Sequence, residues 1–566
     1  MLPQMRSSFV FLFSLGLAAA QIQLKAQLFQ LKGASDVNNV KLNWGSVAPG
    51  TYTIEKGTAS GSLTTLATTT GDSWDDYDLS VGTTYYYRIS GSAGQSSEVS
   101  VTPYTPTGNY RTYDNTQPSR LTVKADIESN GVFYRYSYTP KRPDFVITES
   151  TSTDGYTFTG DAVVLDSQTV CASIQEPCHL ERTTFLKHPT TGEVVMWAHL
   201  ENNRNYGLGQ AASAHGTPGK GPWTFVGSSR PLGHDSRDSA FFADDDAQHS
   251  AYFLSATNVN TDLNVYKLSQ DWTKIESLVT TIAKGQHREA PSLIKVDGSY
   301  YLFTSPAAGW YPSTAGYMSS NDIASGWSDV RNIGNVATWA AQSGGVRKVG
   351  DQYLMLADRW SANWAPSLPP NREYALPVTF GAKGTGAAMY SWYPEVRYQD
   401  DGAQSVYGIQ AGKILSRGKK LTSTPNGGKN IGVAVDGTED SEDFFEPGAV
   451  PFTLEVDLET EHVISAVDLT TRFLPGSETY YQFNITGRGG AAGAKEVVLA
   501  DQKKNTVPGF VSSPVSDGGK YRYVKISVDK VINPHNGHDA DVFRGVVELS
   551  VFGNQMEGDI ERGQQQ

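Results

Sequence analysis

The middle of this sequence repeats one short, aromatic-rich hydrophobic segment five times. The copies lie roughly 50 to 60 residues apart, a spacing typical of propellers and other repeat folds: 132–137, 194–199, 251–255, 300–304 and 352–357. A second, turn-like element recurs after three of them: 152–158, 221–225 and 320–327. A four-stranded propeller blade takes about 40 to 50 residues, so the repeat predicts a five-bladed β-propeller over residues 110–415. One large irregular β-sandwich is the alternative.

Alternating strands outside the repeat predict a β-sandwich on each side of it. Residues 21–103 place short strands at intervals of about ten residues between Gly/Ser turns, and they resemble a fibronectin type III module. Residues 426–554 alternate again in an order similar to a discoidin (F5/8 type C) module, a fold common among carbohydrate-binding modules. Residues 555–566 are predicted to be a flexible tail. The predicted fold class is therefore all-β.

Length and composition agree with this organisation. A chain of 566 residues exceeds what one core organises, and predicts three to four domains. Abundant Gly and aromatic residues with few charges suit β-structure. The net charge of −13 argues against nucleic acid and anionic lipid as partners. Two cysteines exclude a disulfide-dense scaffold and a cysteine-based zinc or iron–sulfur site.

The first 20 residues predict export. One arginine, a short apolar run and small residues before Gln21 form a secretory signal peptide, and the run is too short to span a membrane. We therefore expect a secreted, extracellular protein. We also expect it to be a monomer. In an oxidising compartment Cys171 and Cys178 are predicted to form a local disulfide, with two free buried thiols as the alternative. The sequon at Asn484 is a predicted glycosylation site.

Catalytic groups in a propeller are scattered along the chain, because each blade sends one loop to the same end. Glu289 is predicted to begin an innermost strand, and Ala290 and Pro291 after it form the dry surroundings that raise a carboxyl pKa. Glu181 occupies the equivalent place in an earlier blade. The alternative for each is an ion pair with its neighbour, Arg288 or Arg182.

Two further polar side chains stand at predicted blade entries. Asp238 precedes the strand that begins Phe241–Phe242. Gln342 is the one polar side chain in a small, aromatic-flanked stretch, and is predicted to hydrogen-bond a sugar.

Residues 110–400 resemble glycoside hydrolase family 43, specifically its exo-β-1,3-galactanase branch. The motifs that carry the resemblance are Glu181-Arg, Val195–His199, Asn205–Gly207, Pro231–Asp238, Asp244–Asp246, Glu289–Pro291, Gly309-Trp310, Thr338-Trp and Asp358–Trp360. The resemblance implies an exo-acting, inverting enzyme that releases galactose from β-1,3-galactan, the backbone of type II arabinogalactan. An α-L-arabinofuranosidase or β-D-galactofuranosidase of the same family, or a non-catalytic galactan-binding propeller, are the alternatives.

The resemblance also assigns roles. It makes Glu289 the general acid and Asp238 the residue that orients it and modulates its pKa. It implies that the terminal galactose is bound by Glu181, Tyr206, Asn260 and Trp310. Trp310 would supply a stacking face.

The usual base of the family is an Asp in the first blade, where this chain has Val123, with Asp126 three residues out of register. The resemblance therefore leaves Gln342 or Glu181 to handle the water. No cofactor is implied. A structural calcium ion at Asp436 and Glu548 in the C-terminal unit is a further prediction.

Overall fold

Five consecutive four-stranded sheets form the centre of the chain. The computed structural model describes residues 22–554 except 46–49, 118–120, 142–143, 309–314, 336–337, 339–340, 361–371, 400–405, 439–441 and 474–477. Nearly all regular structure in the described residues is β, which confirms the predicted class. None of the described helices is long and apolar enough to cross a membrane.

Each of the five sheets is an antiparallel meander of four strands that follow one another in sequence. The first joins β10 (Ile127–Ser129), β11 (Val132–Lys141), β12 (Asp144–Ser152) and β13 (Thr159–Asp166). The second joins β14 (Cys178–Lys187), β15 (Val194–Asn202), β16 (Gln210–Gly216) and β17 (Thr224–Ser229). The third joins β18 (Ser239–Ala243), β19 (Ala251–Thr257), β20 (Asp262–Leu268) and β21 (Ile275–Ile282). The fourth joins β22 (Arg288–Val296), β23 (Ser299–Pro306), β24 (Gly316–Ser320) and β25 (Arg331–Asn332). The fifth joins β26 (Gln342–Val349), β27 (Gln352–Arg359), β28 (Arg372–Phe380) and β29 (Ala388–Tyr390).

The five repeated segments are the second strands of these sheets, and their packing explains why they are hydrophobic throughout. On β15, Met196 packs toward the first sheet while the adjacent Trp197 packs against Phe253 of the third. On β23, Leu302 faces the third sheet and Phe303 the fifth. A strand covered on both faces needs apolar side chains at successive positions, so the usual alternation disappears.

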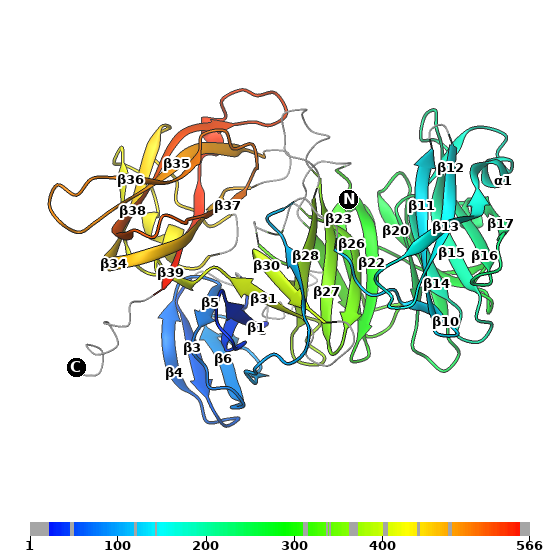
Figure 1. The fold of residues 1–566 in the computed structure, drawn as a ribbon, viewed down its shortest axis with the longest axis horizontal. Helices are drawn as coiled ribbons and strands as arrows, with labels where there is room; N and C mark the ends of the chain where they lie inside the picture. Colours follow the sequence, from blue (N-terminus) through cyan, green and yellow to red (C-terminus); the bar gives the residue numbers. More distant parts are fainter. Residues whose placement is uncertain are drawn as a thin grey trace, which may run out of the picture.

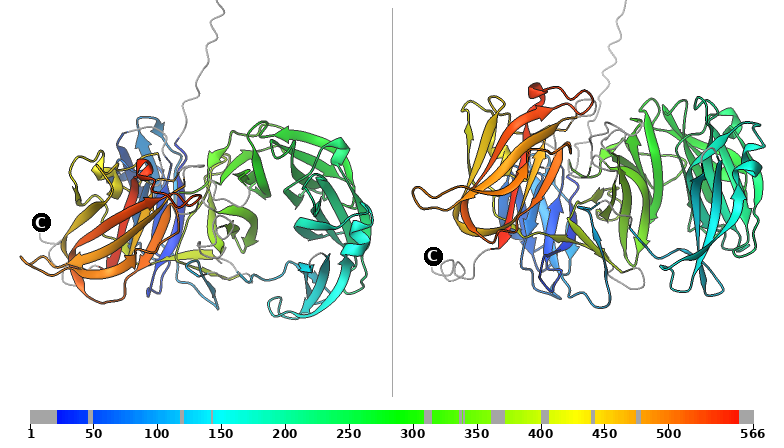
Figure 2. Two further views of the ribbon diagram at one scale, coloured as in Figure 1. Left: turned by 90° about the horizontal axis from the view of Figure 1, so that it is seen from above. Right: turned by 45° about the horizontal axis from the view of Figure 1, so that its top comes forward.

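The sheets follow one another around a curve, with their first strands innermost (Figures 1 and 2). The first strands of the second to fifth sheets, β14, β18, β22 and β26, contact one another in that order. Arg347 on β26 reaches back to the segment before the first sheet, where it pairs with Asp126 and donates to the Lys124 carbonyl at 3.0 Å. Side chains at the starts of the innermost strands are thereby brought together from distant parts of the sequence.

Strand pairing at the N-terminal side does not follow the predicted boundaries. A six-stranded sheet runs in the order β5-β2-β1-β31-β30-β9, and β1 is parallel to β31. Its strands are β1 (Lys25–Leu31), β2 (Asn39–Asn43), β5 (Ser73–Asp76), β9 (Arg111–Asp114), β30 (Glu395–Tyr398) and β31 (Val406–Gln410). Strands β9, β30 and β31, which lie inside the predicted propeller range 110–415, therefore extend the N-terminal sheet. The other sheet of the N-terminal unit holds β3 (Tyr52–Gly57), β4 (Thr64–Thr69), β6 (Tyr85–Gly91), β7 (Gly94–Gln95) and β8 (Val99–Val101).

An eight-stranded sheet forms the C-terminal unit, drawn yellow to red in Figure 1. It contains β32 (Lys413–Ile414), β33 (Lys420–Thr424), β34 (Phe452–Thr471), β35 (Tyr480–Arg488), β36 (Val497–Gln502), β37 (Phe510–Pro514), β38 (Lys520–Ile532) and β39 (Val546–Asn554). Short 3-10 turns η2 (Ile431–Val435) and η3 (Asp541–Phe543) lie beside it, and η1 (Pro231–Gly233) precedes β18. Asn484, the predicted glycosylation site, lies half-buried on β35.

The predicted calcium ligands of this unit lie where it meets the N-terminal sheet. Asp436 accepts hydrogen bonds from Thr438, and its backbone carbonyl accepts one from Thr69 at 2.9 Å. Glu548 accepts one from the Gly437 amide at 3.1 Å. Within the described ranges no three His, Cys, Asp or Glu side chains gather as metal ligands, and calcium binding stays a prediction.

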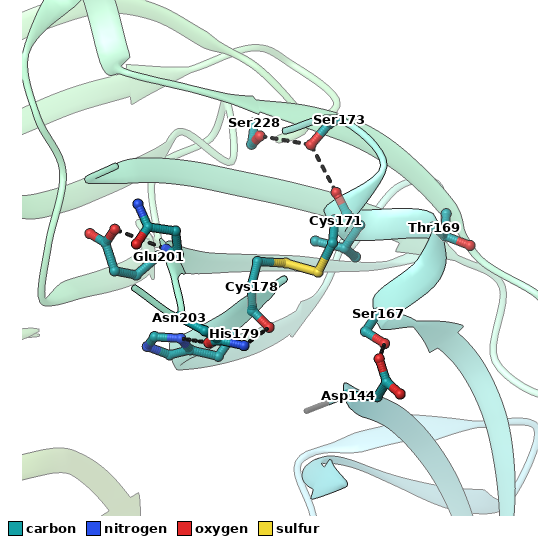
Figure 3. Close-up of a disulfide and its surroundings, with 12 residues drawn as sticks. Asp144, Ser167, Thr169, Cys171, Ser173, Cys178, His179, Glu201, Asn203 and Ser228 are labelled. Carbon is teal, nitrogen blue, oxygen red and sulfur yellow. Dashed lines mark hydrogen bonds between the residues drawn. A yellow bond between two sulfur atoms is a disulfide. The ribbon is translucent and has the colours of Figure 1, made fainter. Parts of the chain in front are cut away.

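The predicted disulfide is present. Cys171 ends the helix α1 (Ser167–Cys171) and Cys178 begins β14, and the sulfur atoms are bonded across a Cα–Cα distance of 5.6 Å (Figure 3). Of the two alternatives, free thiols are therefore wrong. The crosslink fixes the start of the strand that carries Glu181.

Candidate active site

The predicted site residues begin the innermost strands of four successive sheets. Glu181 lies on β14, Asp238 directly precedes β18, and Glu289 and Gln342 lie at the starts of β22 and β26. The ladder register shifts directly after Glu181 and Glu289, and one residue beyond Gln342, after Ser343, so a β-bulge follows each site residue. Bulges re-aim the side chains beside them and are frequent next to active sites.

Two of these bulges contain a non-glycine residue in the left-handed backbone region. Arg182 has φ 53° and Ala290 has φ 50°. Such conformations cost free energy and persist where the surroundings hold them. Both residues directly follow a predicted site glutamate, and both contact Asp238, so the shared geometry aligns the two glutamate-bearing strands around it.

Glu289 is buried, with 6% of its surface exposed, and is held at both carboxyl oxygens. Gln342 Nε2 donates to Oε1 at 3.1 Å, and Asn260 Nδ2 donates to Oε2 at 3.2 Å. Burial, reinforced by the Asp238 charge, raises the pKa of Glu289 to about 8. Arg288, the predicted alternative partner, instead donates to Thr304 at 2.9 Å. Glu289 is therefore a carboxyl that keeps its proton near neutral pH, as a general acid must.

Asp238 joins the second and fourth sheets. Its Oδ2 accepts from Arg182 Nη2 at 3.2 Å and from the Ala290 amide at 3.1 Å. The second contact ties Asp238 to Ala290, the residue that directly follows Glu289 in the sequence. Arg182 thus pairs with Asp238, and the alternative pairing of Arg182 with Glu181 is wrong.

Gln342 uses both ends of its amide. Besides contacting Glu289, its nitrogen donates to Ser305 Oγ at 3.0 Å. Its oxygen accepts from Arg182 Nη2 at 2.6 Å and from Trp360 Nε1 at 2.9 Å. The two donors fix the orientation of the amide, so that Gln342 presents N–H groups to Glu289.

Glu181 lies beside one hydroxyl donor and two imidazole rings on the other side of the site. Tyr206 donates its hydroxyl hydrogen to Oε1, and His179 Nε2 lies 3.5 Å from the same oxygen. His199 Nδ1 lies 3.2 Å from Oε2. Burial raises the pKa of Glu181, but these partners together outweigh it and the net pKa lies well below the ordinary value. Glu181 is an ionised acceptor, suited to sugar hydroxyl groups.

Asn260 ends an exposed turn anchored by Asp235. Residues 258–260 all have positive φ, and Asp235 accepts from the Asn258 and Val259 amides at 2.6 and 3.1 Å. The buried Oδ1 of Asn260 has no hydrogen-bond donor in the described part of the chain. An unsatisfied buried acceptor beside the acid is available to a ligand.

Two of the positions considered from the sequence, Val123 and Asp126, lie away from these groups. Trp310 lies outside the described residues. Asp126 is exposed and paired with Arg347, and Val123 packs against the core that contains Phe29 and Val396. Neither Val123 nor Asp126 joins the four carboxyl and amide groups above.

Sequence reasoning missed the site's shared partners. Arg182 is a common donor to Asp238 and Gln342, and Trp360 fixes the Gln342 oxygen. The buried Glu201 lies behind His199, with Oε2 at 3.4 Å from Nε2. Their positions could have indicated them. Arg182 directly follows Glu181, and His199 lies opposite Glu181 on the neighbouring strand.

Residues 130–369 match the family described as glycosyl hydrolases family 43. The chain therefore carries a family 43 glycoside hydrolase domain and is a glycoside hydrolase. The matched range contains Glu289, Asp238, Gln342 and Glu181, the residues that the fold brings together.

Solved structures of similar fold include exo-β-1,3-galactanases. The enzyme of Phanerochaete chrysosporium with β-1,3-galactotriose is 19% identical, covering 78% of this chain and 100% of that chain with a TM-score of 0.51. With galactose, the values are 20%, 76%, 95% and 0.50. The enzyme of Clostridium thermocellum is 24% identical, covering 78% and 97% with a TM-score of 0.46. Among proteins of curated function, none is significantly similar to this sequence.

Proposed function

We propose that this protein is a secreted, exo-acting, inverting β-1,3-galactanase that releases galactose from the backbone of type II arabinogalactan. The observation that carries the proposal is Glu289, a carboxyl whose pKa is raised to about 8 by burial and by the Asp238 charge, and which is positioned by Asn260 and Gln342. The fold shared with the Phanerochaete chrysosporium exo-β-1,3-galactanase supports the choice of substrate.

The proposal includes the architecture. The five four-stranded sheets would be the blades of a five-bladed propeller, flanked by a fibronectin type III-like and a discoidin-like sandwich. Residues 1–20 would direct export, and the disulfide is compatible with an oxidising compartment. Calcium binding at Asp436 and Glu548, glycosylation at Asn484 and a monomeric state belong to the same proposal.

In the proposed reaction, Glu289 donates its proton to the glycosidic oxygen as the bond to the anomeric carbon breaks. Asp238 holds the strand beside Glu289 and helps to keep the acid protonated before transfer. Glu181, Tyr206 and Asn260 bind the hydroxyl groups of the terminal galactose. Water attacks from the opposite face, which inverts the anomeric centre. The proton that this water loses passes to bulk solvent, by way of Glu181 where that residue acts as the base, and Glu289 regains a proton from solvent.

Gln342 is proposed to orient this water, with Glu181 as the alternative. The Gln342 oxygen accepts two hydrogen bonds and its nitrogen donates two, so one of these four contacts must give way when Gln342 orients the water. Glu181 carries a charge but has a lowered pKa, which makes it a weak base. Azide rescue of the variants Gln342→Ala and Glu181→Gln distinguishes the two residues.

Product analysis tests the substrate. Wild-type protein should release galactose as the sole first product from β-1,3-galactan. Proton NMR should show that the galactose released first has the inverted anomeric configuration. Release of arabinose or galactofuranose from matched nitrophenyl glycosides, without galactan turnover, would favour the furanosidase alternatives. Saturable galactan binding with no released sugar would favour a binding propeller.

A further inference from the structure

A buried imidazole lies between two carboxylates behind the sugar-binding side of the site. His199 is 1% exposed, with Nδ1 3.2 Å from Glu181 Oε2 and Nε2 3.4 Å from Glu201 Oε2. The N–H directions are not aligned as hydrogen bonds, so the contacts are ion pairs. A neutral ring would turn a lone pair toward one carboxylate. The arrangement therefore favours the imidazolium form, with both ring nitrogens protonated.

Glu201 also holds the loop that follows β15. Its Oε1 accepts from the Asn202 and Leu208 amides at 2.9 and 2.6 Å, and its Oε2 accepts from the Gly209 amide at 2.9 Å. Glu201 is fully buried, so these bonds satisfy a carboxylate that water does not reach. The loop between these amides carries Tyr206.

The loop is tied a second time to the disulfide-anchored start of β14. The Asn203 amide donates to the Pro177 carbonyl at 3.0 Å, and its side chain contacts His179 Nδ1 at 2.6 Å. Figure 3 shows His179 and Asn203 together beside Cys178, with Glu201 on the neighbouring strand. The backbone on both sides of the loop is thus fixed independently of His199.

We propose that Glu201 and His199 are positioning residues, which together hold Glu181 ionised and keep Tyr206 against it, so that the pair presents a fixed acceptor and hydroxyl to the terminal sugar. This inference rests on the proposed function for its ligand, galactose. Neither residue touches the reacting atoms. Both act through Glu181: His199 acts by its charge, and Glu201 acts by its charge and by the geometry of the loop.

The charges around His199 support this assignment. The groups that face it are Glu181 and His179 from β14, Glu201 from its own strand, and Tyr206 from the loop. Burial lowers the pKa of His199, but the two carboxylates outweigh it and the pKa is raised. Burial raises the pKa of Glu201, but His199 and the loop amides lower it to about 2.

The sign of the pH effect follows. Loss of the imidazolium removes a positive neighbour from Glu181 and raises the Glu181 pKa. Glu181 must be ionised to accept sugar hydroxyls, so the acid limb of kcat/KM should move to higher pH. A merely structural role would lower the amount of folded enzyme without moving this limb.

Two variants test the proposal, with a matched control. His199→Gln removes the cation and leaves the loop anchors of Glu201, and Glu201→Gln removes the charge but keeps an amide oxygen. Glu193→Gln is the control, since Glu193 pairs with His215 at 3.1 Å on the same sheet away from the site. We expect both test variants to raise KM for β-1,3-galactan and Kd for galactose about tenfold, with kcat within about threefold, and the control to change neither. Unchanged KM and Kd in folded test variants would overturn the proposal.

Histidine NMR of the wild-type protein keeps the proposal testable if both variants fail to fold. His199 should retain two ring N–H protons at a pH at which exposed histidines of the protein have lost one. A neutral His199 at pH 7 would overturn the proposal without reference to activity. Failure of the galactanase function itself would show separately, as wild-type protein that neither cleaves galactan nor binds galactose.

Discussion

Gln342 Nε2 lies 3.1 Å from Glu289 Oε1, although the two residues come from adjacent sheets and are 53 positions apart in the sequence. The amide oxygen of Gln342 is held by Arg182 and Trp360, so its nitrogen cannot turn away from Glu289 without breaking both contacts. The acid is therefore fixed by a network that spans the second, fourth and fifth sheets. A fixed acid needs little reorganisation when it transfers its proton.

Replacement of Asp238 should shift the pH dependence of activity. The Asp238 charge raises the pKa of Glu289, so Asp238→Asn should lower that pKa and move the basic limb of kcat/KM to lower pH. We expect kcat at neutral pH to fall roughly 10²-fold, within the range of general acid catalysis. A pH–rate profile on β-1,3-galactan measures both effects. A basic limb that stays in place would contradict the coupling.

Glu289 should cost stability in return for activity. The pKa of Glu289 is higher in the folded protein than in the unfolded chain. The free energy of unfolding therefore falls as the pH rises above about 4.5, where the unfolded carboxyl ionises, and stops falling above about pH 8. Glu289→Gln should therefore stabilise the protein by up to about 3 kcal/mol at pH 7 and by little at pH 4. Thermal unfolding at the two pH values measures the difference. Equal stabilisation at pH 7 and pH 4 would show that burial does not raise the pKa of Glu289.

Azide should identify the residue that handles water. Azide attacks without losing a proton, so it can replace an activated water. We expect azide to restore turnover of a nitrophenyl β-galactoside in Gln342→Ala, with a galactosyl azide as product, and to have no effect on Glu181→Gln. The reverse pattern would assign the water to Glu181.

Removal of the disulfide should weaken both folding and sugar binding. The crosslink closes a short loop, which corresponds to about 2 to 3 kcal/mol in the chain-entropy account. Cys171→Ser with Cys178→Ser should lower the free energy of unfolding by that amount and raise KM, because β14 carries Glu181. Chemical denaturation and galactan kinetics provide the measurements. Unchanged KM would mean that the strand holds its position without the bond.

The fold could be anticipated where local pattern decides it. The five aromatic segments predicted the second strands of five sheets, because a strand buried on both faces is hydrophobic at every position. The pairing of β1 with β31 could not be anticipated, since the two segments, 25–31 and 406–410, are far apart in the sequence and either could pair elsewhere. Long-range strand pairing leaves little trace in one sequence.

The site was predictable for its acids and not for their supports. Glu289, Asp238, Glu181 and Gln342 could be predicted as polar residues at blade entries, with small or apolar neighbours at Glu289 and Gln342. The structure links Glu289, Asp238 and Gln342 through shared contacts. Arg182 and Glu201 read as ordinary charged neighbours. Their functions depend on left-handed bulge geometry and on a loop closing over a buried carboxylate, which a linear pattern does not specify.

Kinetics of Glu289→Gln on β-1,3-galactan test the central claim most directly. The variant keeps the size of Glu289 and one of its two accepted hydrogen bonds, but its amide has no acidic proton to give to the leaving oxygen. We predict that galactose release falls at least about 10³-fold, while galactose binding is retained and thermal stability is not lowered. Turnover near the wild-type rate in this folded variant would contradict the assignment of Glu289 as the general acid.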